Sequence, residues 1–239
     1  MFANPTVTSG LAYLILLVLV GCGPSKPKDY SHYNLYRSKL PASILVLPPT
    51  NQSVEVNAPY SYLSTITEPI AEAGYYVFPV AVVDAYMKEN GLPTPADMHA
   101  VPLDKLAEVF DADAVLYIDI QAYGQEYKIV SSGAVARAEA ELIDLDSGET
   151  LWSGGIDAVE EASSGSSDNI LGALIGAAVA QAVGSSFDAS HGVAQQANRR
   201  MVFDRDRGFL LGPYHPGADQ DVRGRPEPIQ PAEQATLPQ

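Results

Sequence analysis

Residues 133–158 read GAVARAEAELIDLDSGETLWSGGIDA, and this stretch decides the fold. Small apolar residues alternate with charged ones along residues 133–145, which is typical of a strand with one buried and one solvated face. Asp146, Ser147 and Gly148 are turn residues, and residues 149–158 return as the partner strand. The stretch therefore predicts an antiparallel β-hairpin whose second arm carries the chain's only tryptophan, Trp152.

Strand and helix patterns alternate upstream of the hairpin. The predicted strands are residues 43–47 (SILVL), 75–79 and 113–123, the last with Leu116, Ile118, Ile120 and Ala122 on one face. The predicted helices are residues 60–74, 80–90 and 102–110. Pro69 inside the first of these predicts a kink or a break. This order predicts the α/β class, with a single mixed-sheet domain and helices packed on the sheet.

Residues 169–187 predict a strongly apolar helix downstream of the hairpin, and Asp188 is a plausible N-cap for its continuation to residue 203. Gly172 and Gly176 have the GxxxG spacing, but the apolar stretch is too short to span a bilayer. Burial against the sheet is the first interpretation. The second is a close contact between two subunits at Gly172 and Gly176, which would give a homodimer.

The N-terminal segment has the features of a bacterial lipoprotein signal peptide. Residues 11–20 form an apolar run of signal-peptide length, and the following Gly21-Cys22 completes a sequence similar to a lipobox. Cys22 is then the site of lipidation, with acyl chains such as palmitate as a membrane anchor. The first ten residues depart from the pattern because they lack Lys and Arg. The alternative is a buried N-terminal element with a chance cysteine.

Proline content and polarity set the predicted domain limits. They give a signal peptide at residues 1–21, a lipid anchor and tether at 22–42, the α/β domain at 43–212 and a mostly disordered tail at 213–239. Gly23, rather than an acidic residue, follows the cysteine. This favours sorting to the outer membrane, with the domain facing the periplasm.

The charge balance excludes several classes of partner. The chain has 29 Asp and Glu against 14 Lys and Arg, with a formal net charge of -15. Such a charge argues against binding to nucleic acid or to anionic lipid. The basic residues look scattered, and Arg199-Arg200 is the only adjacent pair. Since Cys22 is the only cysteine, no intramolecular disulfide can form.

No catalytic pattern stands out, and the sequence predicts a protein that is not an enzyme. The four histidines are far apart without metal-binding spacing, so neither a metal nor a cofactor is expected. The acidic pairs Glu160-Glu161 and Asp111/Asp113 fit structural positions better than catalytic ones. Asp119, which lies among apolar neighbours, is the carboxylate whose burial is worth checking.

Four longer stretches carry a resemblance to a known family. They are ILVLPPTNQSVEVNAP (44–59), EPIAEAGYYVFPVAVVDAYMKENGL (68–92), PLDKLAEVFDADAVLYIDI (102–120) and LLGPYHP (210–216). The chain resembles a bacterial lipoprotein family catalogued as domain of unknown function 799. The resemblance implies a fold like the N-terminal domain of the Tol-system translocation protein, lipid anchoring and frequent dimers. It also implies that the gene occurs together with that of a curli-channel-like lipoprotein. The family supplies no catalytic residues.

Two classes of function follow. The first is a lipid-anchored periplasmic subunit of an outer-membrane export or surface-assembly complex, which acts by protein–protein binding. The alternative is an envelope hydrolase or a regulator of cell-wall synthesis. The missing catalytic pattern favours the first.

Overall fold

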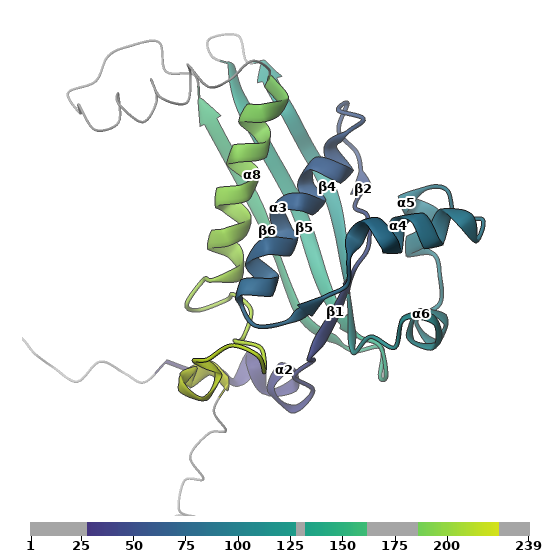
Figure 1. Cartoon of the computed structure of the whole chain (residues 1–239). Helices are drawn as coiled ribbons and strands as arrows, with labels where there is room; N and C mark the ends of the chain where they lie inside the picture. Colours follow the sequence, from purple (N-terminus) through teal and green to yellow (C-terminus); the bar gives the residue numbers. More distant parts are fainter. Residues whose placement is uncertain (1–27, 128–131, 162–185, 225–239) are drawn as a thin grey trace, which may run out of the picture. The chain divides into compact units, whose positions relative to one another are not determined.

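Three long antiparallel strands form most of the sheet in the computed structural model, which describes residues 28–127, 132–161 and 186–224 (Figure 1). They are β4 (Ala114–Tyr127), β5 (Ser132–Asp144) and β6 (Thr150–Glu161). Strands β5 and β6 are the arms of the predicted hairpin, which is confirmed. Its turn is closed by the Asp144 carboxylate, which accepts hydrogen bonds from the Ser147 N–H at 2.9 Å and from its hydroxyl at 2.6 Å.

Short parallel strands extend the sheet beyond β4. Strand β1 (Ser43–Val46) lies between β4 and β3 (Tyr76–Val77), and β2 (Thr50–Asn51) also pairs with β4. The main order is β3-β1-β4-β5-β6, so the sheet is mixed and the predicted α/β class is confirmed. Residues 44–46 are fully buried, which explains why this strand reads as a continuous apolar run.

Two helices cover one face of the sheet. Figure 1 shows α3 (Ala58–Glu72) and α8 (Ser186–Val202) lying across the long strands. The Tyr62 hydroxyl on α3 donates to the Asn198 side chain on α8 at 2.7 Å, and both residues are buried. The alternating alanines of β5 point to this side and are buried, because small side chains let a helix approach the sheet closely.

Three short helices cover only part of the opposite face. They are α4 (Val80–Glu89), α5 (Pro95–His99) and α6 (Leu103–Phe110), and they form a second core with β1 and the beginning of β4. This core contains Leu45, Leu47, Val83, Met87, Met98, Leu106 and Val115. Further along β4 and across β5 and β6, no helix among the described residues covers this face, which we call the open face.

The structure corrects three local predictions. A register shift lies between Ile120 and Ala122 of β4, so the buried side passes to Tyr123, which is 3% exposed, instead of Ala122. Helix α3 continues through Pro69 to its last turn without a break. Asp188 lies inside helix α8 (Ser186–Val202) instead of at its N-cap.

The segment predicted as a tether is partly folded. Residues 31–33 form the 3-10 helix η2 (Ser31–Tyr33) and residues 34–38 form α2 (Asn34–Ser38). Tyr33 is 2% exposed and Tyr36 is fully buried. Residues 32–39 therefore belong to the domain, and the predicted tether at 22–42 is too long. The proline-rich context concealed two tyrosines whose rings are large enough to hold the segment in place.

The described part of the predicted tail is also folded. The N–H groups of Gly212 and Tyr214 donate to the carbonyls of Ala73 and Gly74, at 2.8 and 3.1 Å, just past the end of α3. The 3-10 helices η3 (Ala218–Gln220) and η4 (Val222–Gly224) follow. Disorder from residue 213 is therefore wrong for residues 213–224, while residues 225–239 lie outside the described part of the chain.

The two ends of the domain meet in one group of side chains, which we call the terminal cluster. It consists of Tyr33, Tyr36, Tyr75, Phe209 and Arg223. The Phe209 ring meets Tyr36 and Tyr75 edge to face, at centroid distances of 6.2 and 6.0 Å. The hydroxyls of Tyr36 and Tyr75 are 2.9 Å apart, and the Arg223 guanidinium lies 5.7 Å from the Tyr33 ring centre. Residues from both ends of the domain thus share one buried core.

Candidate functional site

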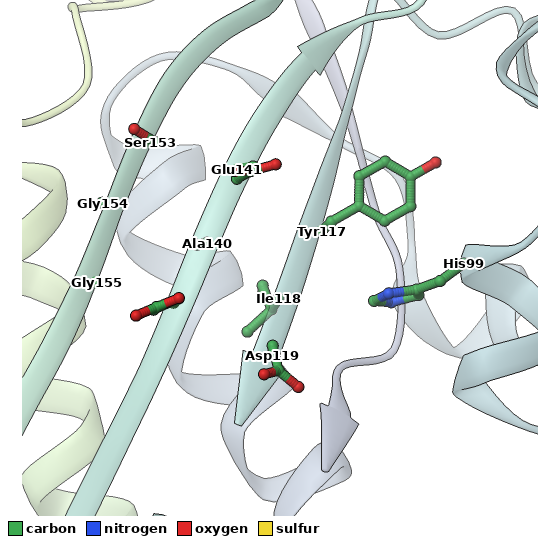
Figure 2. A pocket seen from close by; sticks show the side chains of 10 residues that line it. His99, Tyr117, Ile118, Asp119, Ala140, Glu141, Ser153, Gly154 and Gly155 are labelled. Atoms are coloured by element: carbon green, nitrogen blue, oxygen red, sulfur yellow. The ribbon is translucent and has the colours of Figure 1, made fainter. Parts of the chain in front are cut away.

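The open face is hollowed beside α5. A cavity of about 530 Å³ lies there, with side chains of β4, β5 and β6 along it and His99 of α5 at one side. Figure 2 shows His99 and Tyr117 on one side of this groove and Ser153 on the other, with Asp119 and Glu141 between them. We call this cavity the sheet groove.

The wall formed by α5 is fixed by its local sequence. The Thr94 hydroxyl accepts the N–H of Asp97, and the Asp97 carboxylate accepts the N–H of Thr94, both at 3.2 Å. This capping box, with Pro95 in the first turn, starts the helix. His99 ends it, and its Nε2–H donates to the carbonyl of Pro48 at 2.9 Å. The imidazole is therefore held at the rim of the groove.

The same wall carries no charge near neutral pH. The rings of His99 and Tyr117 meet edge to face with centroids 5.0 Å apart. Burial lowers the pKa of His99 from its ordinary value, although the hydrogen bond to Pro48 opposes this. Burial likewise raises the pKa of Tyr117. Both rings are thus neutral, and they offer aromatic surface.

Three carboxylates give the sheet groove its negative charge. Asp119 is opposite Glu139 across the β4–β5 ladder, and Glu141 is two residues further along β5. Asp119 accepts hydrogen bonds from Thr50 Oγ1 at 2.6 Å and from Gln52 Nε2 at 2.5 Å. Glu139 and Glu141 are exposed, and their carboxylates form no hydrogen bond or ion pair with any residue that the structure describes. Like charges opposite one another on a sheet weaken the pairing, so these carboxylates are better suited to holding a cation than to stabilising the fold.

Catalytic geometry is missing from the groove as far as it is described. Ser153 hydrogen-bonds to no base in the described chain, and His99 lies on the opposite side (Figure 2). A nucleophilic serine needs such a base within hydrogen-bond reach. The described histidines and carboxylates also form no group of three or more that could hold a metal ion. The arrangement is able to bind a cationic group, and it contains no recognisable reacting set.

A serine–histidine contact does occur between α3 and α8. Ser61 Oγ lies 3.1 Å from His191 Nδ1 and 2.6 Å from the hydroxyl of Tyr123. Ser61 is 7% exposed, and no hydrogen bond from His191 to a carboxylate is found among the described residues. The contact satisfies polar groups inside a helix interface, and it lacks the third group that orients a catalytic histidine.

The structure places the predicted site residues in different regions. Cys22, Gly172 and Gly176 lie outside the described residues, so lipidation and the glycine contact stay predictions. Asp119 is half-buried at the groove instead of in a core. Glu139 was correctly predicted on a solvated strand face. The groove itself was missed, because no sequence pattern indicates that α5 brings a histidine beside β4.

Two other acidic residues have the structural positions that the sequence favoured. The Asp113 carboxylate accepts the backbone N–H groups of Ala42 and Ser43 at 2.9 and 2.8 Å. Asp111 ends α6 in the left-handed conformation, with φ 53°, which Asp tolerates better than most residues. Neither residue lines the sheet groove.

Comparisons with known proteins show the family. The model of the family described as "Putative lipoprotein GNA1162-like" matches residues 28–214. A relative from Neisseria meningitidis serogroup B, described as a lipoprotein, is 41% identical over 204 residues, with 85% of this chain and 94% of that protein covered. In the part that the structure describes, no helix is both long and apolar enough to cross a membrane.

Solved structures also match, each over a smaller share of this chain. The crystal structure of lipoprotein GNA1162 from Neisseria meningitidis is 46% identical, covers 59% of this chain and 98% of its own, and superposes with a TM-score of 0.49. A PelC dodecamer from Paraburkholderia phytofirmans is 15% identical, with 66% and 84% coverage and a TM-score of 0.40. The family model and the relative that is 41% identical together decide the assignment: this chain belongs to the GNA1162-like lipoprotein family.

Proposed function

We propose that this chain is a lipid-anchored periplasmic subunit of an outer-membrane export or surface-assembly complex, and that it acts by binding another protein in the sheet groove. Membership of a lipoprotein family supports an anchored envelope protein. The observation that carries the binding role is the pair of unpartnered carboxylates, Glu139 and Glu141, in a hollow beside a neutral aromatic wall. Catalysis has no comparable support among the described residues.

The anchor is proposed at Cys22, the only cysteine. Cys22→Ala should leave an unprocessed precursor or a periplasmic species that no longer pellets with membranes. Mass spectrometry of the mature N-terminus checks this, because a lipidated cysteine adds diacylglycerol and acyl mass. An unmodified mature N-terminus at another residue would refute the site. The absence of an acidic residue at position 23 supports the outer membrane as the destination.

The partner in the groove is proposed to present a basic segment. Two carboxylates without partners attract Lys or Arg side chains, and the rings of Tyr117 and His99 can lie against a guanidinium or an alkyl stem. The net charge of the chain adds a long-range attraction for cations. Anchoring to one membrane keeps both proteins in a thin layer, so a weak contact suffices.

Photo-crosslinking in native envelopes tests this role. A photoreactive residue at Ser153, which is exposed in the groove, should capture a discrete partner, whereas one at exposed Glu89 on α4 should not. Glu139→Lys with Glu141→Lys should reduce capture about tenfold, because both ion pairs become repulsive. The control, Glu89→Lys with Glu149→Lys, changes the net charge equally and should leave capture unchanged. Equal loss in both double variants would refute the groove as the site.

Three finer features belong to the same proposal. A homodimer through Gly172 and Gly176 is expected to weaken in sedimentation experiments when both are changed to Leu. A curli-channel-like lipoprotein is one candidate partner, and the crosslinked species would identify it. A fold like the N-terminal domain of the Tol-system translocation protein is compatible with the mixed sheet.

The alternative is an envelope hydrolase or a regulator of cell-wall synthesis. The hydrolase rests on the hydrogen-bonded pair of Ser61 and His191. Turnover of an envelope substrate by the purified chain, lost in Ser61→Ala while the fold survives, would replace the binding role with this one. Crosslinking of the groove to a cell-wall synthase would instead favour the regulator.

A further inference from the structure

The basic residues are concentrated at the two ends of the domain. Residues 32–39 and 199–224 together contain seven Lys and Arg and four Asp. The intervening residues 40–198 contain only four Lys and Arg against twenty-two Asp and Glu. The basic residues that look scattered in sequence are therefore separated from most of the acidic ones.

The fold brings these two segments together. His32 Nε2–H donates to the carbonyl of Asp206 at 3.2 Å, and the Tyr33 hydroxyl donates to the carbonyl of Gly208 at 2.5 Å. Both bonds join the beginning of the domain to the loop that follows α8. Figure 1 shows α2 and the end of α8 at the same end of the domain. The fold thus brings basic residues of both segments to one end of the domain, where Lys39 also pairs with Asp144 and Asp146 of the β5–β6 turn.

Exposed guanidinium groups lie near an aromatic ring at this end. A shallow depression there includes Arg199, Arg200, Phe203 and Arg205, together with Asp204 and Asp206, and Arg207 follows in the same loop. We call Arg199, Arg200, Phe203, Arg205 and Arg207 the basic end. Phe203 is 37% exposed, and the Arg199 guanidinium lies 5.3 Å from its ring centre.

Three of these arginines are available for a ligand. Arg199 is paired with Glu72 of α3. The side chains of Arg200, Arg205 and Arg207 are exposed, and they form no ion pair with an acidic group within the described chain.

The acidic groups beside them are few. The Asp204 carboxylate accepts the N–H groups of Asp206 and Arg207 at 2.8 and 2.7 Å, so it is already occupied. Asp221 is held by Arg223 of the terminal cluster, at 2.9 Å. Residues 199–207 contain four Arg and two Asp, and Glu72 pairs with Arg199, so a small excess of positive charge remains at the basic end.

The position of the basic end along the chain limits its distance from the anchor. Nine residues lie between Cys22 and His32, and the ten Cα-to-Cα steps that join them reach at most about 35 Å when fully extended. If Cys22 carries the lipid, as the proposed function states, residue 32 and the loop bonded to it remain within that distance of the bilayer.

We propose that the basic end docks on the anionic headgroups of a phospholipid bilayer. Arginine matches phosphate oxygens with two parallel hydrogen bonds, and an aromatic ring is stable at the headgroup level. The anchor alone would leave the domain free to rotate, and this contact gives the domain a fixed orientation on the membrane. The acidic remainder is repelled by the same surface, which sharpens the orientation. The expectation from net charge alone argues against anionic lipid, and the proposal differs from it because it considers one end of the domain separately.

Lipid-headgroup quenching measures the orientation directly. The mature lipidated chain is reconstituted into vesicles that contain nitroxide headgroups, either neutral or with about a third anionic phospholipid. Because Cys22 is the only cysteine and is blocked by lipid, a fluorophore can be placed on Gln196→Cys beside the basic end. A matched probe goes on Val54→Cys, which is 97% exposed before the N-terminal end of α3. Quenching at residue 196 should exceed that at residue 54 several-fold on anionic vesicles only.

Charge-matched variants give the decisive comparison. Arg200→Gln, Arg205→Gln and Arg207→Gln together should abolish the excess quenching at residue 196. Each basic side chain near an anionic surface contributes roughly a fivefold factor in binding. Lys88→Gln, Lys105→Gln and Arg137→Gln remove the same charge elsewhere and should retain it.

The outcomes separate this inference from the proposed anchor. Equal quenching at residues 196 and 54, or equal effects of the two triple variants, would overturn the docking of the basic end. Failure of the chain to float with neutral vesicles would refute the anchor. In that case the quenching comparison on anionic vesicles still decides the docking. Circular dichroism of both triple variants excludes unfolding as the cause.

Discussion

A chain trimmed to residues 43–215 should unfold at a much lower temperature than a chain of residues 28–224. Trimming removes Tyr33, Tyr36 and Arg223 from the terminal cluster and leaves the rings of Tyr75 and Phe209 exposed. Loss of two buried aromatic side chains costs about 4–6 kcal/mol, which is a large share of the usual free energy of unfolding. Differential scanning calorimetry measures the change.

Single-end deletions separate the two contributions. Chains of residues 43–224 and 28–215 each lose one side of the terminal cluster. The unfolding temperature of each should therefore lie between those of the chains 43–215 and 28–224. The periodic apolar sequence on its own would place the domain limits near residues 43 and 215, and it would make trimming harmless. Coincident melting curves for the long and trimmed chains would support those limits and would contradict a stabilising role for the terminal cluster.

Gly74→Ala should destabilise the domain by about 3 kcal/mol or more. Gly74 follows α3 with φ +93°, and a Cβ there would lie 2.4 Å from the backbone nitrogen of His215. The C-terminal segment would have to move away, with loss of the hydrogen bonds that Gly212 and Tyr214 donate to the end of α3. Chemical denaturation of the purified variant measures the loss.

Gly91→Ala is the matched control. Gly91 also has positive φ, +85°, but nothing lies within 4 Å of the Cβ that alanine would add. The stability of this variant should therefore fall only by the cost of placing alanine at positive φ, about 1 kcal/mol. If Gly74→Ala and Gly91→Ala lost the same stability, the close approach of residues 212–215 to α3 would not matter to the fold.

The local hydrophobic pattern was sufficient to predict strands that are buried on one face or on both faces. The alternating alanines of β5 and the apolar run of β1 both follow from which sides of a strand are covered. The bulge in β4 after Ile120 was not predictable, since an extra residue leaves no mark in composition. The same holds for Asp188, because a residue suited to an N-cap can also lie within a helix.

The prediction of the two ends of the domain was wrong for a different reason. Tyr33 and Phe209 are isolated aromatic residues in polar, proline-containing surroundings, so neither segment has a period of its own. Each is stable only against the other, and that contact is not local. The sheet groove is similar: Glu139 was predictable as a solvated residue, whereas its nearness to His99 depends on how α5 packs.

The bond between Tyr33 and Gly208 joins positions 175 residues apart in the chain. During synthesis Tyr33 leaves the ribosome long before Gly208, and at typical rates of about 5–20 residues per second the delay is many seconds. During that interval the C-terminal residues that Tyr33 and Tyr36 contact in the finished fold have not yet been made. Contacts of such large separation form late, after the entropy of closing the loop has been overcome. The contacts of Tyr33 with Gly208 and of Tyr36 with Phe209 therefore complete the fold only after the whole domain has been synthesised.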